Sequence, residues 1–378
     1  MNLKQKITHN LLNIPGWRTK RHIVVIESDD WGAIRMPSKE VYNKLLSEGI
    51  RVDRDPYCRY DGLATANDLE ALFEALTSVK DSNNNYPIIT ANCVVANPNF
   101  EEIKKSNYSE YFYETIAETF NKSEKHQGVW RMWKEGVNNN IFYPQFHGRE
   151  HLNIKEWLQA LRSNDIITHK GFEYGLYGLT HNVDSSIKCN YMGAFDSAID
   201  EDVMKYKEII TDGLNIFEKL FGYRSKSFIA TRYTWPEEIE LTLKNNDILY
   251  LQGIITHVVP VCNDRGFIYR KDNYQGKKNK NGLIHLMRNC FFEPTLSNNS
   301  ENIVNDCLNR INIAFRWNKA AVISTHRINF VGLIDERNRI NNIRLFKILL
   351  SEIVKRWPDV EFVSSAQLGD IISSSYIK

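Results

Sequence analysis

Four short polar stretches each follow an apolar run of the sequence, at residues 28–32, 147–151, 232–236 and 324–326. The first carries a pair of aspartates and the second carries two histidines. Carboxylate oxygens and imidazole nitrogens are typical ligands of borderline divalent metals such as zinc. One aspartate and two histidines can supply three ligands to one ion, which leaves the second carboxylate for proton transfer. The set therefore predicts a metal site with its own acid–base group.

Asp29 and Asp30 come directly after the apolar run 22–28. Consecutive strand residues point to opposite faces unless the strand has already turned, so the two carboxylates cannot both bind one ion comfortably. We expect a division of roles, in which one aspartate ligates the metal and the other stays free as a base. A plain surface turn is the alternative for such a pair.

His147 and His151 stand four residues apart, so both imidazoles project on one face if the chain turns helical after Phe146. This spacing predicts two ligands of one metal. The same five residues also fit His-x-x-Glu-His, the inverted zinc-protease signature, with Glu150 as base and a further glutamate on a partner helix. Phe228 stands near where that glutamate is usually spaced, and the flanking strand pattern does not suit a site between two helices.

His326 follows the apolar run 320–325, and an imidazole beside a metal site can protonate a leaving amine. A core histidine bonded to backbone is the alternative. Arg232 follows another apolar run, and its guanidinium could pair with Asp29, lower the pKa of that carboxyl and fix its orientation. A purely structural salt bridge is the alternative there. Three aromatic residues close to these stretches would offer the flat apolar faces that sugar rings prefer: Trp31, Tyr233 and Trp235.

Short apolar, β-rich segments alternate with segments of helical periodicity along the chain. The predicted strands are 22–28, 87–95, 141–146, 226–231, 248–255, 283–288, 320–325 and 361–364, and the clearest helices are 38–48, 66–79, 200–221 and 335–356. Strands that are apolar almost throughout predict a mainly parallel sheet covered by helices. Seven or eight such units indicate an α/β fold, a closed or nearly closed (β/α) barrel, in which function gathers after the strands' carboxyl ends.

The absence of a fixed-period repeat or a low-complexity linker indicates a single domain over 1–378, with 1–20 as an N-terminal extension. Segment 169–198 is rich in Gly and Tyr and long for a connection, so we expect it to form a lid or a substrate wall.

The composition excludes several classes of protein. Formal net charge is +2, from 48 basic and 46 acidic residues, so no general attraction to nucleic acid or to an anionic membrane is expected. The six cysteines are scattered, and Cys93 lies within an apolar run, which is typical of a reducing compartment. The sequence starts without the apolar region of a secretory signal and has no apolar run of about 18 residues. We expect a cytoplasmic protein without a transmembrane segment.

Together these motifs resemble those of the polysaccharide deacetylases of carbohydrate esterase family 4, over residues of about 22 to 368. The family's Thr-Phe-Asp-Asp-Gly, His-Ser/Thr-x-x-His, Arg-x-Pro and Leu-x-His motifs correspond to the four stretches in order. The resemblance implies a distorted (β/α) barrel of that type. It also implies these roles: base, Asp29; metal ligands, Asp30, His147 and His151; arginine that tunes the base, Arg232; general acid, His326.

Three departures from the family pattern stand out. Gly148 replaces the hydroxyl residue between the histidines, and the proline after Arg232 comes later than in Arg-x-Pro. The family's Asp-Trp motif has no match, and Arg288, Asn289 and Glu293 are candidates to replace it.

The resulting hypothesis is a metal-dependent hydrolase that removes an acetyl group, N-acetyl in the first place, from a sugar. Zinc suits the ligand set, and other first-row divalent ions fit it too. A cytoplasmic location points to precursors of surface polysaccharide, such as a nucleotide sugar or a lipid-linked oligosaccharide. Two alternatives remain open: a glycoside hydrolase on a related barrel that uses two of Glu27, Glu150 and Glu293, and an inactive carbohydrate-binding protein.

Overall fold

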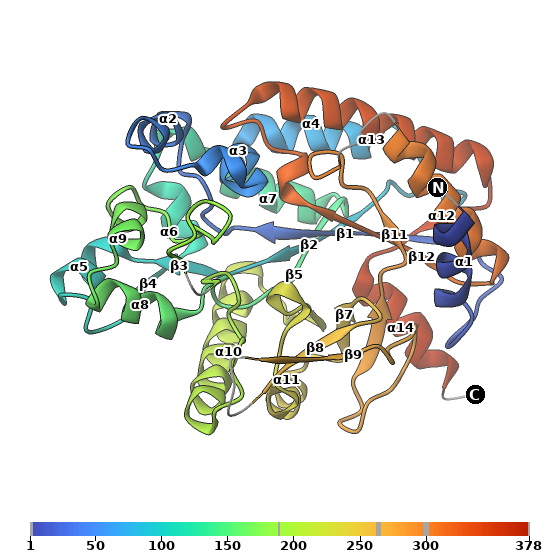
Figure 1. The fold of residues 1–378 in the computed structure, drawn as a ribbon. Coiled ribbons are helices and arrows are strands. Elements are labelled where there is room, and N and C mark those ends of the chain that lie inside the picture. The colour runs from blue at the N-terminus through green and yellow to red at the C-terminus, as the bar shows by residue number, and fades with distance from the viewer. Residues whose placement is uncertain (1–2, 188–189, 262–265, 298–301, 377–378) are drawn as a thin grey trace.

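A parallel sheet forms the centre of the protein (Figure 1). The computed structural model describes residues 3–187, 190–261, 266–297 and 302–376. The strands run in the order β10-β7-β6-β5-β2-β1-β12-β11, and β13 pairs with β1. Their bounds are β1 Ile23–Trp31, β2 Ile89–Cys93, β5 Phe142–Phe146, β6 Ser227–Phe228, β7 Tyr250–Gly253, β10 Ile284–Met287, β11 Cys290–Phe291, β12 Ala321–His326 and β13 Glu361–Phe362. Each predicted strand is confirmed, with bounds shifted by a few residues.

The sheet forms an α/β barrel, as predicted. Its two edge strands, β10 and β11, follow each other almost directly in the sequence, and together they form one bent strand that joins the two edges of the sheet. β10 pairs with β7 and β11 pairs with β12, although only Arg288 and Asn289 separate β10 from β11. Two residues cannot make the crossover that parallel neighbours need, so β10 and β11 do not pair with each other. The stretch instead changes neighbours: the N–H of Arg288 donates to Gly253 O at 2.8 Å, and that of Asn289 donates to Val322 O at 3.2 Å.

The N-terminal segment packs against this junction. The side chain of Asn289 donates to Asn13 Oδ1 at 2.9 Å. Lys319 is almost fully buried beside β12, and its ammonium donates to three successive backbone carbonyls of residues 15–17, each at 2.7 Å. Residues 15–17 are therefore held by charge-assisted hydrogen bonds, which are stronger than neutral ones such as that at Asn13.

Helices surround the barrel. They are α1 Leu3–Leu12, α2 Lys39–Ser47, α3 Pro56–Tyr60, α4 Ala66–Leu76, α5 Phe100–Lys105, α6 Ile116–Asn121, α7 Val129–Asn138, α8 Ile154–Arg162, α9 Ile166–Glu173, α10 Asp200–Phe221, α11 Glu240–Asn245, α12 Ile303–Arg316, α13 Glu336–Arg356 and α14 Ser365–Ser375. In Figure 1, α4 and α13 lie above the sheet, and α10 and α11 lie below it. The four helices predicted from periodicity are confirmed as α2, α4, α10 and α13. Short 3-10 turns complete the set: Val52–Arg54, Glu124–His126, Thr231–Tyr233, Glu237–Ile239 and Arg327–Asn329.

Two small two-stranded antiparallel sheets were not predicted: β3 (Ala96–Pro98) with β4 (Tyr113–Thr115), and β8 (His257–Pro260) with β9 (Phe267–Arg270). These strands are only three or four residues long. Such short runs carry no recognisable alternation of apolar and polar residues.

A second hydrophobic cluster lies beyond the carboxyl ends of the strands. It combines α8 and α9 with the irregular segment that follows them, including Tyr177, Leu179, Ile187 and Met192. In Figure 1, α8 and α9 lie on the side toward which the arrow of β1 points. The end of the barrel where the functional site was expected is therefore covered by α8, α9 and the segment that follows them, which have a hydrophobic core of their own.

Four of the six cysteines are buried free thiols: Cys58, Cys93, Cys290 and Cys307. Cys189 and Cys262 lie outside the described residues. Burial raises the pKa of the Cys93 thiol, which keeps it protonated. In the described part of the chain, none of the helices combines the length and the apolar character needed to cross a lipid bilayer.

Candidate metal centre and acid–base groups

Asp29 and Asp30 lie at an irregularity of β1. The register of β1 with β2 shifts between Ser28 and Trp31, and Asp30 has φ 72°, in the left-handed region that is rare for residues other than glycine. The strand has thus turned at Asp30. As a result both carboxylates line one cavity of about 470 Å³ instead of pointing to opposite faces.

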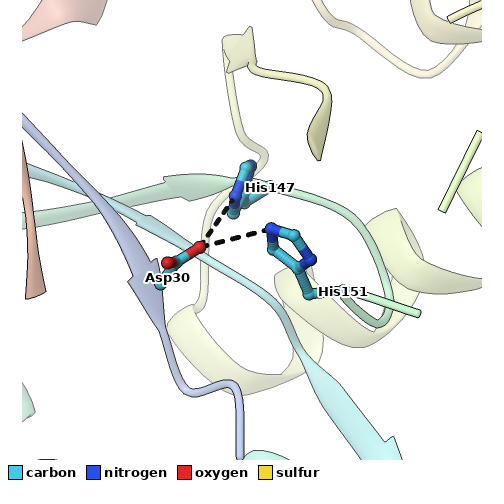
Figure 2. Close-up of side chains that lie close together, drawn as sticks. All are labelled: Asp30, His147 and His151. Carbon is cyan, nitrogen blue, oxygen red and sulfur yellow. Dashed lines mark ion pairs between the residues drawn. The ribbon is translucent and has the colours of Figure 1, made fainter. Parts of the chain in front are cut away.

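Asp30, His147 and His151 converge on one point, as Figure 2 shows. Their ligand atoms lie within 4.8 Å of one another. Asp30 Oδ1 is 3.5 Å from His147 Nε2 and 3.3 Å from His151 Nε2. All three side chains are buried. One carboxylate and two imidazoles are a common ligand set for zinc and related ions.

The protonation of the two rings fits a cation at this point. His147 Nδ1 lies 2.8 Å from the carbonyl oxygen of Ile229, which can only accept, so Nδ1 carries the proton. Burial lowers the pKa of His151 to about 4, and its ring is therefore neutral at neutral pH. With Nδ1 bonded to that carbonyl, Nε2 is the ring atom of His147 that faces Asp30 Oδ1. A carbonyl that orients the far ring nitrogen is typical of metal-bound histidine.

A loop, not a helix, brings the two histidines together, so the predicted helical turn is wrong. The backbone from residue 147 to 153 is irregular, and α8 begins only afterwards. His147 N donates to Cys93 O, and Arg149 O accepts from the backbone of residues 95 and 96, so the loop is tied to the chain after β2. Gly148 has φ +119°, and an added Cβ would lie 3.1 Å from Glu150 O. A hydroxyl residue would be strained there.

Glu150 does not contribute to this centre. Its carboxylate accepts from Arg149 Nε at 2.7 Å, and it lines a different cavity. The inverted zinc-protease arrangement, which needs this glutamate as base, does not fit the geometry.

Asp29 is held by a buried arginine, Arg288. Arg288 donates to both carboxylate oxygens of Asp29, at 2.6 and 2.7 Å, and to Glu27 at 2.6 Å. Asn92 donates to Asp29 Oδ1 at 2.7 Å. Burial opposes the charge of Asp29, but the Arg288 guanidinium outweighs it and holds the pKa of that carboxyl below its usual range.

The predicted pairing of Arg232 with Asp29 is therefore wrong. Arg232 lines the same cavity but its guanidinium pairs with Asp196, with Nη1 and Oδ2 2.5 Å apart. The turn at Arg232 and Tyr233 explains this, because both have φ 57° and redirect the chain after β6. Arg288 reaches Asp29 from the point where the bent strand changes neighbours. In the sequence, Arg288 stands out only as a candidate to replace the missing Asp-Trp motif.

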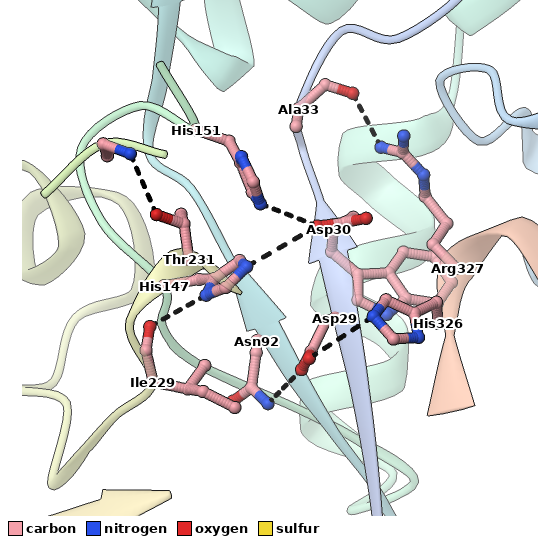
Figure 3. A network of polar contacts seen from close by, with 12 residues as sticks. Asp29, Asp30, Ala33, Asn92, His147, His151, Ile229, Thr231, His326 and Arg327 are labelled. Atoms are coloured by element: carbon pink, nitrogen blue, oxygen red, sulfur yellow. Dashed lines mark hydrogen bonds and ion pairs between the residues drawn. The ribbon is translucent and has the colours of Figure 1, made fainter. Parts of the chain in front are cut away.

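His326 lies on another side of Asp29, as Figure 3 shows. Its Nε2 is 3.8 Å from Asp29 Oδ2, and its Nδ1 is 2.6 Å from Glu293 Oε1. Burial opposes the charged ring, but Glu293 and Asp29 outweigh it and raise the pKa of His326 to about 9. Asn329 donates to the other oxygen of Glu293 at 2.7 Å, which fixes the carboxylate. His326 is thus a protonated donor at neutral pH, oriented by Glu293.

Arg35 is a site residue that no sequence pattern indicated. Its Nη2 donates to Asp30 Oδ2 at 3.0 Å, which leaves Oδ1 for the histidines. Burial opposes the charge of Asp30, but Arg35 and the two imidazoles hold the pKa of Asp30 well below its usual range. The guanidinium also lies over the ring of Tyr57, 4.9 Å from its centre, and both residues line the cavity.

Two of the three aromatic residues expected to face a sugar do not line the cavity. Trp31 is 1% exposed and packs in the core against Phe142, and Trp235 is 3% exposed and stacks on His257. The prediction is wrong for both, because their apolar surface is used in packing. Tyr233 does line the cavity, and its hydroxyl accepts from Arg288 at 3.0 Å.

Comparison with known proteins gives matches among solved structures only. A scan against protein-family models and a search of curated proteins both find no match. Among solved structures, a Mycobacterium smegmatis protein assigned as a polysaccharide deacetylase is 11% identical, with TM-score 0.45 over 96% of this chain and 94% of that chain. PuuE allantoinase is 13% identical, with TM-score 0.47 over 94% and 93%.

A carbohydrate esterase family 4 pseudoenzyme from Bacillus anthracis also matches, with 8% identity and TM-score 0.35 over 92% of this chain and 66% of that chain. The structural matches thus include the family whose motifs the sequence resembles.

The metal centre gives the first prediction. Elemental analysis of the purified protein by mass spectrometry should find one divalent ion per chain. His151→Ala should weaken metal binding by more than the roughly 10–100-fold that loss of a supporting residue costs. His326→Ala, which removes a cavity imidazole outside the cluster, should bind metal like the parent protein. Equal metal loss in both variants would contradict the assigned ligand set.

The two arginines give a second prediction. Arg288→Met leaves Glu27 and Asp29 buried without their counter-charge and should lower the free energy of unfolding by about 3–5 kcal/mol. Arg232→Met removes a pair whose arginine and aspartate side chains are 40% and 11% exposed, so water can partly replace the guanidinium and the cost should be smaller, about 1–2 kcal/mol. Urea unfolding followed by circular dichroism measures both. Similar losses in the two variants would refute this assignment of the arginines.

Proposed function

We propose that this protein is a metal-dependent hydrolase that removes an acetyl group, N-acetyl in the first place, from a sugar. One observation carries the proposal: Asp29 and His326 adjoin the cluster of Asp30, His147 and His151, and all five line one cavity. A carboxylate that can accept a proton and an imidazolium that can donate one are the two groups that amide hydrolysis needs beside a metal.

Asp29 has the role of base. Arg288 and Asn92 keep its carboxylate ionised and fixed in direction, so it can accept a proton from water that attacks the acetyl carbon. A divalent ion held by the cluster would supply Lewis-acid polarisation of the acetyl carbonyl.

His326 has the role of acid. Its raised pKa keeps the ring protonated, and Glu293 directs Nε2 toward Asp29 and the cavity. As the bond between the acyl carbon and nitrogen breaks, His326 donates its proton to the departing nitrogen. The products are acetate and a free amine on the sugar. The backbone N–H of Tyr233, a residue that lines the cavity, donates to Ala230 O at 3.1 Å and is not free to bind an oxyanion.

The geometry does not favour a glycoside hydrolase. Such an enzyme needs two carboxyl groups that flank the scissile bond. Glu27 is buried against Arg288 and Ser365, Glu150 pairs with Arg149, and Glu293 bonds to His326. None of these three glutamates lines the cavity.

Zinc as the native ion, a cytoplasmic location and a precursor of surface polysaccharide as substrate stay predictions from the sequence. The same holds for the single domain over 1–378 with its extension at 1–20.

The role of Asp29 gives a third prediction. Asp29→Asn keeps the size and most hydrogen bonds of the side chain but cannot take a proton, so acetate release from N-acetylated sugars should fall by about 10²- to 10⁴-fold. Metal content should stay at one ion per chain. Activity equal to that of the parent would refute the role, and glycan binding without turnover in the parent protein would favour an inactive binding protein.

A fourth prediction concerns pH. Since His326 must be protonated to act as an acid, activity should persist below a pH of about 9 and fall above it. Glu293→Gln removes the charge that raises the pKa of His326, so the fall should begin at a lower pH. The pH profile of kcat/KM measures the shift. Glu124→Gln, a change at an exposed position remote from the cavity, serves as control, and an unshifted alkaline limb in Glu293→Gln would contradict the coupling.

A further inference from the structure

The cavity above the metal centre has walls as well as a floor. The floor consists of the residues at the ends of β1, β5, β6 and β12. One wall is formed by Asp55, Pro56 and Tyr57 at the start of α3. The other wall is formed by residues 178–187 and 190–192, here called the wall segment, which contribute Thr180 and Met192 among others. This segment lies within 169–198, for which the sequence predicted a lid or a wall.

The wall segment is packed in place. Ile187, Tyr191 and Met192 are buried in the second hydrophobic cluster. Tyr191 O accepts from Asn153 N at 2.7 Å, just after the loop that carries the histidines. A segment with this much buried apolar surface keeps a fixed shape, because moving it would expose that surface to water.

Hydrogen bonds join the two walls to each other and to the floor. Thr180 Oγ1 donates to Asp55 Oδ2 at 2.7 Å, which links the wall segment to α3. Beyond the other end of the wall segment, Ala194 N donates to Thr231 Oγ1 at 3.0 Å, in the turn after β6. The described parts of this segment are therefore tied to α3 at one end and to the turn after β6 at the other, and we call the joined walls the rim.

Among the described residues, no such wall stands between Tyr233 and His326. The cavity is lined there by Tyr233, in the turn after β6, and by Asp29 and His326, at the ends of β1 and β12. A polymer that passes through a site needs two open ends, whereas the walls formed by the described residues leave this side alone without one. The volume of about 470 Å³ lies in the lower part of the range of about 300–1,000 Å³ for small-molecule sites.

We propose that the pocket holds only one sugar unit: a single N-acetylated sugar, or the terminal residue of a short oligosaccharide. The rest of the oligosaccharide would extend out of the pocket past Tyr233 and His326. We call this end-on binding. This inference rests on the proposed deacetylation and adds its substrate class. The wall segment and Asp55 set the specificity by excluding residues inside a glycan chain, and the bond between Thr180 and Asp55 keeps that rim closed.

The test uses the metal-loaded protein with N-acetylglucosamine and its linear oligomers up to the hexamer. Acetate release gives kcat/KM for each, and tandem mass spectrometry after heavy-oxygen labelling of the reducing end locates the free amine. One amine at a terminal residue, with kcat/KM changing by less than about 3-fold beyond the dimer, is the expected result. Amines at interior residues, with kcat/KM rising about tenfold or more with length, would overturn the proposal.

A second measurement separates this inference from the proposed function. If no sugar releases acetate, the deacetylase assignment fails, and calorimetric titration of Asp29→Asn with the same series still decides the shape of the pocket. A Kd that stops improving beyond the dimer supports end-on entry. A Kd that tightens steadily up to the hexamer overturns it.

Thr180→Val tests the rim directly, because it keeps the volume of the side chain and removes the bond to Asp55. Interior deacetylation, or binding of longer oligomers, should increase several-fold. Thr211→Val on α10, which removes a bond to the backbone of its own helix and one from Asn246 and does not line the cavity, is the matched control. If Thr180→Val and Thr211→Val behave alike, the Thr180–Asp55 bond does not close the rim.

Discussion

The left-handed backbone of Asp30 is the constraint on which the site depends. In a regular strand Asp29 and Asp30 would face opposite sides of the sheet, and the metal ligand and the base could not share a cavity. The shifted register between β1 and β2 places one extra residue in β1 at this point, and the chain turns there. Such a conformation costs of order 1–3 kcal/mol and persists only where its surroundings fix it. Arg35, Arg288 and Asn92 bind the two carboxylates and provide that fixation.

Each charged group of the site has a partner of opposite charge. Arg288 forms ion pairs with Asp29 and Glu27, Arg35 with Asp30, and Glu293 with His326. Burial alone would neutralise most of these groups. The pairs keep the base ionised and the acid protonated at the same pH, as hydrolysis with two opposite proton transfers requires.

Much of the fold followed from the sequence, because its strands are apolar on both faces and end in polar residues. That pattern is local, and it also placed Asp30, His147 and His151 correctly near one another. The partners of the charged groups were harder to predict. Arg288 and Arg35 pair with Asp29 and Asp30 through contacts that no sequence spacing determines, and Arg232 was drawn away by a turn with positive φ.

The aromatic residues show the same limit. Trp31 and Trp235 lie close to site residues in the sequence. In a strand or a turn, however, adjacent side chains point in different directions, so these two rings fill the core while the site residues face the cavity.

The bent strand that completes the barrel has a consequence for the chemistry. Arg288 stands where that strand exchanges one neighbour for another, and Asn289 beside it is bonded to Asn13. The first helix and the turn after it therefore act as a brace for the guanidinium that sets the charge of Asp29. Removing the N-terminal segment would therefore loosen Arg288, which lies far along the chain, and through it the proton acceptor Asp29, although no described residue of that segment lines the cavity.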